Sequence, residues 1–120
     1  MLLHKDLDVY KISIEFVTDI YKLTERFPKE EAYGLKSQMR RAAVSIPSNI
    51  SEGAGRISQK EFKNFLSIAS GSASEVETQL EICFNLKYIN ENELKDYILK
   101  INQIKKMCYG LIRKINSKFT

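Results

Sequence analysis

Apolar side chains recur every three or four residues along almost all of this 120-residue chain. At that spacing side chains share one face of an α-helix, and no segment shows the alternation typical of a half-buried strand. The pattern breaks at "FPKEEAYG", at "EGAGR" and at "KYINENE". It therefore predicts four helices, over about residues 7–26, 35–54, 59–87 and 91–117.

Each predicted helix has one apolar stripe that we expect to face a shared core. The expected stripe of the first helix consists of Leu7, Tyr10, Ile14, Val17, Ile20, Tyr21 and Phe27. Short connections make consecutive helices antiparallel neighbours. The chain is therefore predicted to be a single all-α domain over residues 1–120, an up-down-up-down antiparallel four-helix bundle.

Local signals refine the helix ends. Ser58 with Glu61, and Asn90 with Glu93, have the spacing of capping boxes at the starts of the third and fourth helices. Pro47 interrupts no apolar spacing, so we expect the second helix to pass through it with a kink.

Small residues mark two segments. In "IASGSASEVE" a glycine inside a helix costs roughly 1 kcal/mol relative to alanine. We expect this segment, around Gly71, to permit close approach of a neighbouring helix. The glycines of "EGAGR" are expected to cap and turn the chain rather than to bind phosphate.

The few chemically reactive residues do not form a catalytic pattern. Cys83 and Cys108 lie 25 residues apart, and the single histidine, His4, is distant from both in sequence, so no metal-ligand spacing results. A serine nucleophile would have no base besides His4. We predict buried thiols, no metal, no cofactor and no enzymatic activity. Without a signal peptide or membrane span, the expected compartment is the cytoplasm.

Charge is unevenly distributed along the chain, whose formal net charge is +4. Residues 1–34 have a net charge of −2, residues 35–63 of +4, residues 64–99 of −4 and residues 100–120 of +6. Blocks of alternating sign favour pairing of helices with one another and also binding to a polyanion.

Two adjacent arginines, Arg40 and Arg41, have no acidic residue three or four positions away on their own helix. Their guanidinium groups therefore need a carboxylate on another helix, a partner protein, a phosphate or solvent. The third helix offers acids that also lack a local cation, namely Glu75, Glu77 and Glu81.

The segment "YGLKSQMRRAAVSIPSNISEGAGRISQKEFKNFLSIASGSASEVETQLEI", together with "LDVYK", resembles the four-helix-bundle proteins encoded in intervening sequences of bacterial 23S ribosomal RNA genes. The accessory variability protein of diversity-generating retroelements shares this family shape. The resemblance implies a homopentameric barrel with a basic surface and no established enzymatic activity. It also implies nucleic acid, and a nucleic-acid enzyme such as a reverse transcriptase, as partners.

Two functions follow as hypotheses. The first is electrostatic binding of structured RNA or RNA–DNA. Its candidate contacts are Arg40, Arg41, Arg56, Lys60, Lys63, Lys105, Lys106, Arg113 and Lys114. The second is a protein-interaction scaffold, in which the same charges hold subunits together or receive a partner.

Overall fold

All four predicted helices are present in a computed structural model, which describes residues 7–118. They are α1 (Asp8–Thr24), α2 (Leu35–Ala54), α3 (Gln59–Asn85) and α4 (Glu91–Lys118), with a short 3₁₀ turn, η2 (Lys29–Glu31), between the first two. The predicted bounds of α2 are confirmed at both ends, and those of the other helices agree to within two residues. The 3₁₀ turn was not predicted, because its three residues, Lys29–Glu31, include no apolar side chain.

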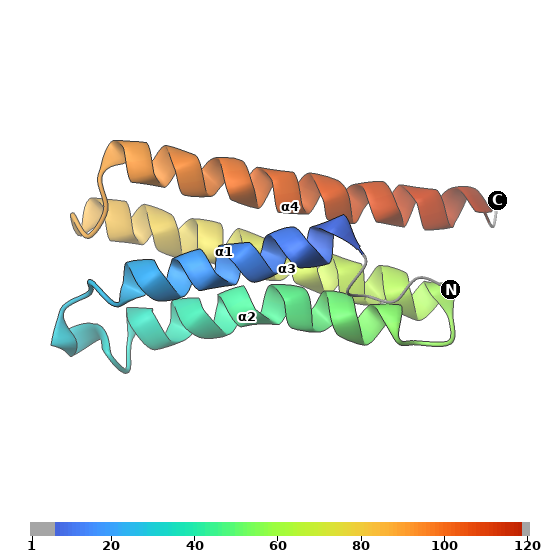
Figure 1. Ribbon diagram of the computed structural model, residues 1–120, viewed down its shortest axis with the longest axis horizontal. Coiled ribbons are helices and arrows are strands. Elements are labelled where there is room, and N and C mark those ends of the chain that lie inside the picture. The colour runs from blue at the N-terminus through green and yellow to red at the C-terminus, as the bar shows by residue number, and fades with distance from the viewer. Residues whose placement is uncertain (1–6, 119–120) are drawn as a thin grey trace.

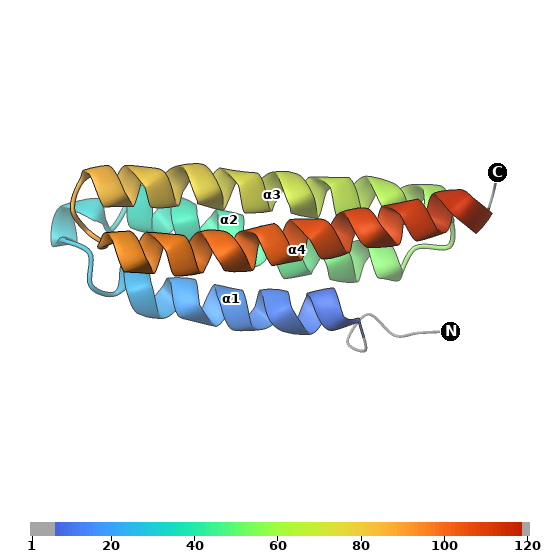
Figure 2. The ribbon, with the colours of Figure 1, turned by 90° about the horizontal axis from the view of Figure 1, so that it is seen from above.

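The helices form an antiparallel bundle with up-down-up-down connections (Figures 1 and 2). Each helix packs against the next one in the chain, and α4 returns to pack against α1. Within residues 7–118 the diagonal pairs, α1 with α3 and α2 with α4, have no backbones in close approach. Packing is most extensive between α2 and α3 and least extensive between α1 and α4.

Apolar residues from all four helices fill the bundle interior. The largest fully buried side chains are Val9, Phe16, Ile20, Leu23, Met39, Ile46, Ile50, Leu66, Val76, Leu80, Ile101 and Ile104. Burial of a side chain of this size contributes about 1.5–3 kcal/mol. All four helices thus supply side chains to the core, as expected for one shared interior.

The stripe predicted for α1 is partly wrong. Its buried face consists of Val9, Ser13, Phe16, Ile20, Leu23 and Thr24. Ile14 and Tyr21, which were expected in the core, are 42% and 41% exposed. This helix has two apolar stripes, and periodicity alone does not tell which of them faces inward.

Of the two predicted capping boxes one is complete among the described residues and one is half formed, and a further motif ends α3. Asn90 and Glu93 form a complete capping box, since each backbone N–H donates to the other side chain, at 3.0 and 2.8 Å. At the start of α3, Ser58 Oγ accepts from the Glu61 N–H at 3.0 Å. Helix α3 ends in a Schellman motif around Lys87, which has a φ of 65° where glycine is the usual residue.

The glycines of the two small-residue segments differ in how closely other atoms surround them. Helix α2 is continuous through Pro47, as predicted, while the bend at that residue stays a prediction. Gly53 lies on the buried face of α2, within the predicted bounds, and Gly55 is the C-cap, as expected. A Cβ at Gly53 would stand 2.6 Å from Phe65 Cβ. At Gly71, in contrast, a Cβ would meet no atom within 4 Å. Close approach of α2 and α3 therefore depends on Gly53. The segment around Gly71 also packs against α2, as expected, since Ser72 Oγ lies 2.8 Å from Ser45 Oγ. Gly71 itself takes no part in this packing within the chain.

The thiols are buried, as predicted. Cys83 and Cys108 are both free, and Cys83 Sγ lies 3.5 Å from Met39 Sδ. His4 lies outside the described residues. Among residues 7–118 no helix has an apolar stretch that would reach across a bilayer, and no cluster of three side chains has the composition of a metal site.

Candidate nucleic-acid interface

The fold distributes the nine predicted basic residues over three places. Five lie at the end of the bundle where α2 ends, α3 begins and α4 ends, which is the right-hand end of Figure 1. We call this group the basic end; it consists of Arg56, Lys60, Lys63, Arg113 and Lys114. Two lie on α2 beside α1, and two lie near the middle of α4. Because α2 and α4 are diagonal, these last two pairs are not brought together.

The basic end joins segments from distant parts of the sequence. Lys63 Nζ donates to Asn116 Oδ1 at 2.7 Å, which ties the first turns of α3 to the last turns of α4. Lys60 precedes Lys63 by three residues and Arg113 precedes Asn116 by three, so each shares a helix face with a member of that bond. The +4 and +6 blocks of the sequence therefore meet here.

Three cations of the basic end have no internal partner. The charged side-chain groups of Lys60, Arg113 and Lys114 are exposed and form no ion pair or hydrogen bond with another described residue. Arg56 is different, because it pairs with Glu52 one turn earlier and its guanidinium lies 5.1 Å from the centre of the Phe65 ring. The unpaired cations are available to an external anion.

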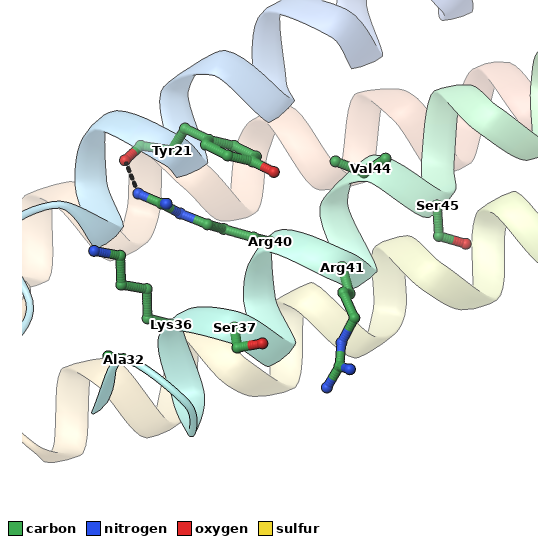
Figure 3. Close-up of a pocket in the computed structure, with 8 residues that line it drawn as sticks. All are labelled: Tyr21, Ala32, Lys36, Ser37, Arg40, Arg41, Val44 and Ser45. Atoms are coloured by element: carbon green, nitrogen blue, oxygen red, sulfur yellow. Dashed lines mark hydrogen bonds between the residues drawn. The ribbon is translucent and has the colours of Figure 1, made fainter. Parts of the chain in front are cut away.

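The two adjacent arginines border a surface groove between α1 and α2 (Figure 3). Its volume is about 520 Å³, and it is lined by Tyr21, Ala32, Lys36, Ser37, Arg40, Arg41, Val44 and Ser45. In Figure 3, Arg40 extends to Tyr21, whereas Arg41 points away from it. The two guanidinium groups therefore have different surroundings.

Arg40 caps the carboxyl end of α1. Its Nε donates to Thr24 Oγ1 at 2.8 Å, and its Nη2 donates to the Tyr21 carbonyl at 3.1 Å and to Glu25 Oε2 at 2.9 Å. The guanidinium also lies 4.3 Å from the centre of the Tyr21 ring. A cation at this position satisfies terminal carbonyls and is favoured by the helix dipole.

Glu25 belongs to the same cluster. The hydrogen bond from Arg40, followed by the charge of Lys36 at 3.7 Å, lowers the pKa of the Glu25 carboxyl. Lys36 lies one turn before Arg40 and was not among the candidates from the sequence. The spacing of four residues between the two cations was a signal that they share a face.

The acids of α3 do not pair with the two arginines, contrary to the complement suggested from the sequence. The acid bound to Arg40 is Glu25, and Arg41 has no ion pair or hydrogen bond with any described residue. Glu75 instead accepts from Gln79 at 3.3 Å, one turn later on the same helix. Glu77 lies 4.0 Å from Lys105 of α4.

Near the middle of α4, only part of the basic charge is free. Lys105 is held at the seam with α3 by Glu77, whereas Lys106 is exposed and has no partner among residues 7–118. Lys100, which was not a candidate, bonds to Asp19 of α1 at 2.9 Å. Positive charge on α4 therefore partly serves packing of the bundle.

Both the sequence and the fold of this chain are similar to those of known proteins. A family model described as the 23S rRNA-intervening sequence protein matches residues 5–110. The structure is similar to a crystal structure from Bacteroides thetaiotaomicron, described as a protein with unknown function from the S23 ribosomal protein family. The TM-score is 0.80 and the sequence identity 28%, over 87% of this chain and 97% of that one. A search among curated proteins finds no match.

Proposed function

Because this chain belongs to the 23S rRNA-intervening sequence protein family, we propose that it is an oligomeric, non-enzymatic protein that binds structured RNA or RNA–DNA through phosphate contacts. The homopentamer suggested by the resemblance is the expected assembly. The observation on which the proposal rests is the basic end, where α3 and α4 bring together three cations that have no internal partner among the described residues.

Unpaired Lys60, Arg113 and Lys114 favour phosphate binding for a simple reason. An exposed cation without an internal ion pair can bind a phosphate without first breaking a contact with a carboxylate. Binding also releases counterions condensed on the nucleic acid. Assembly of several copies would present several basic ends to one nucleic acid. Linked contacts raise apparent affinity by effective concentration, so a modest patch in each copy is sufficient.

Fluorescence anisotropy with labelled structured RNA and duplex DNA, across a salt series, tests the proposal. Wild-type protein is expected to bind at micromolar concentration or below, more weakly as salt rises. The triple variant Lys60→Gln, Arg113→Gln, Lys114→Gln should bind more weakly. On a duplex its log–log salt slope should be shallower by about 0.9 for each phosphate that the variant no longer neutralises.

A matched control removes three exposed cations from the opposite end of the bundle, at Lys22, Lys29 and Lys87. Their ammonium groups also have no partner among the described residues. The control variant has the same net charge as the first, so an equal weakening of binding in both would indicate a general charge effect. That result, or no binding of wild type at low salt, contradicts the basic end as the interface.

A protein-interaction scaffold is the second candidate function. It is favoured by large apolar side chains on the surface, among them Ile57 and Tyr33, which are fully exposed in the connections on either side of α2. A scaffold would remain oligomeric and fail to bind RNA or DNA at any salt concentration. Native mass measured beside anisotropy separates the two candidates.

A further inference from the structure

We propose that the surface between α1 and α2 binds the outward face of α3 from a second copy of this chain. The copies then associate side by side, each through two different faces. This inference rests on the oligomer proposed above and deepens it by assigning the two contacting faces. On both faces the single chain leaves apolar side chains exposed.

The first face is an apolar groove. It has a volume of about 300 Å³ and is lined in part by Ile14 and Val17 of α1 and by Val44 and Pro47 of α2. Ile14 and Val44 are 42% and 38% exposed. The groove therefore includes Ile14, which the bundle leaves exposed, beside Val17, which is partly buried against the core.

The second face lies on α3. Ile68, Gly71, Glu75 and Ile82 follow one another at intervals of three, four and seven residues, so they share one side of the helix. Ile68 and Ile82 are 50% and 43% exposed. Gly71 costs helix stability and accommodates nothing inside this chain, since no atom lies within 4 Å of its Cβ position. A bare backbone at this place allows another helix to approach closely.

The charges of the two faces are complementary. Arg41 lines the adjoining groove, which shares Val44 with the apolar one, and its side chain has no partner among the described residues, so it contributes positive charge beside the apolar groove. Glu75, whose carboxylate accepts only from the amide of Gln79 within residues 7–118, contributes a negative charge to the α3 face. Contact between copies would join these two charges and bury the exposed isoleucines.

The two faces belong to different parts of the bundle, because α1 and α3 are diagonal to one another. An interface between two different faces is heterologous, so each copy offers one groove and one α3 face. Such contacts repeat from copy to copy and end only by closing into a ring. Disabling either face alone should therefore dissociate the whole assembly.

Native mass spectrometry in the absence of nucleic acid tests this arrangement. Val44→Glu disables the groove, and Ile82→Lys disables the α3 face; both positions are exposed, and circular dichroism verifies that the helices remain. Each variant alone is expected at the mass of one chain, 13.9 kDa. An equimolar mixture should form a dimer with one copy of each variant and nothing larger, because one intact groove meets one intact α3 face.

The matched control is Leu99→Lys on α4, an exposed leucine outside both faces, which should retain the wild-type mass. Failure of the mixture to form the mixed dimer overturns the assignment. If both variants keep the wild-type mass, the assembly exists but uses other faces. A wild type that is monomeric at all concentrations overturns the assembly itself, whereas RNA binding is measured separately.

Discussion

Gly53 of α2 lies so close to Phe65 of α3 that a Cβ at position 53 would stand 2.6 Å from Phe65 Cβ. Phe62 closes the same space, with its Cδ1 at 3.0 Å from that position. The most extensive helix packing in the bundle thus depends on the absence of one methyl group.

We expect Gly53→Ala to destabilise the fold by about 1–3 kcal/mol, because overpacking forces the backbones of α2 and α3 apart. The matched control is Gly110→Ala, since a Cβ at Gly110 meets nothing within 4 Å and alanine is the better helix former. Urea denaturation at one fixed protein concentration measures both. Equal effects of the two substitutions would show that the contact with Phe65 relaxes without cost.

Arg40→Ala should destabilise the protein by about 1.5–3 kcal/mol, because it removes charge-assisted bonds to Thr24, to Glu25 and to the end of α1. Arg40→Lys should recover only part of this stability, since an ammonium does not reproduce the fork of donors. Lys36→Ala, which removes only the 3.7 Å pair with Glu25, is the control and should cost less than about 1 kcal/mol. Thermal unfolding ranks the three variants, and an Arg40→Ala variant as stable as wild type contradicts the capping role.

Acid is expected to weaken the end of the bundle where Arg26 meets Glu93. The two side chains form a double contact, at 2.6 and 3.3 Å, and this hydrogen bonding lowers the pKa of Glu93. A lowered folded pKa gives stability that is complete above the unfolded value of about 4.3 and is lost as the pH falls through the folded value.

The stability difference between wild type and Glu93→Gln should therefore be largest near neutral pH and should shrink below about pH 4.3. Arg26→Gln should produce the same flattened profile from the other partner. Urea midpoints measured across the acidic range check this. A difference that stays constant with pH would mean that Glu93 acts only as the cap of α4.

The thiols should be unreactive in the folded protein. Burial raises the pKa of Cys83 to about 12 and that of Cys108 to about 11, so the reactive thiolate is scarcely populated at neutral pH. Titration with a chromogenic disulfide should detect no rapid reaction in buffer and two thiols per chain in urea. Rapid modification of either cysteine in buffer would show that the core opens at that position.

Helix positions and caps were predictable because they depend on neighbours in sequence. Periodicity gives the bounds of α2, and the spacing of Asn90 and Glu93 gives their capping box. The partner of Arg40 was not predictable. Glu25 lies on the other side of the connection between α1 and α2, and the conformation of that connection determines which carboxylate lies next to Arg40. The roles of Gly53 and Gly71 were also unpredictable, since both sit at helical spacing and only packing distinguishes a crowded glycine from an open one.

The basic end has a consequence for any ring built from this bundle. Cyclic symmetry turns every copy about one axis without inverting it, so all basic ends of a ring whose axis runs along the bundles point to the same rim. Such a ring is sided, with a cationic rim formed by the ends of α2 and α4 and an opposite rim formed by the connection from α3 to α4. A nucleic acid would approach from one side only, and the other side would remain accessible to a different molecule.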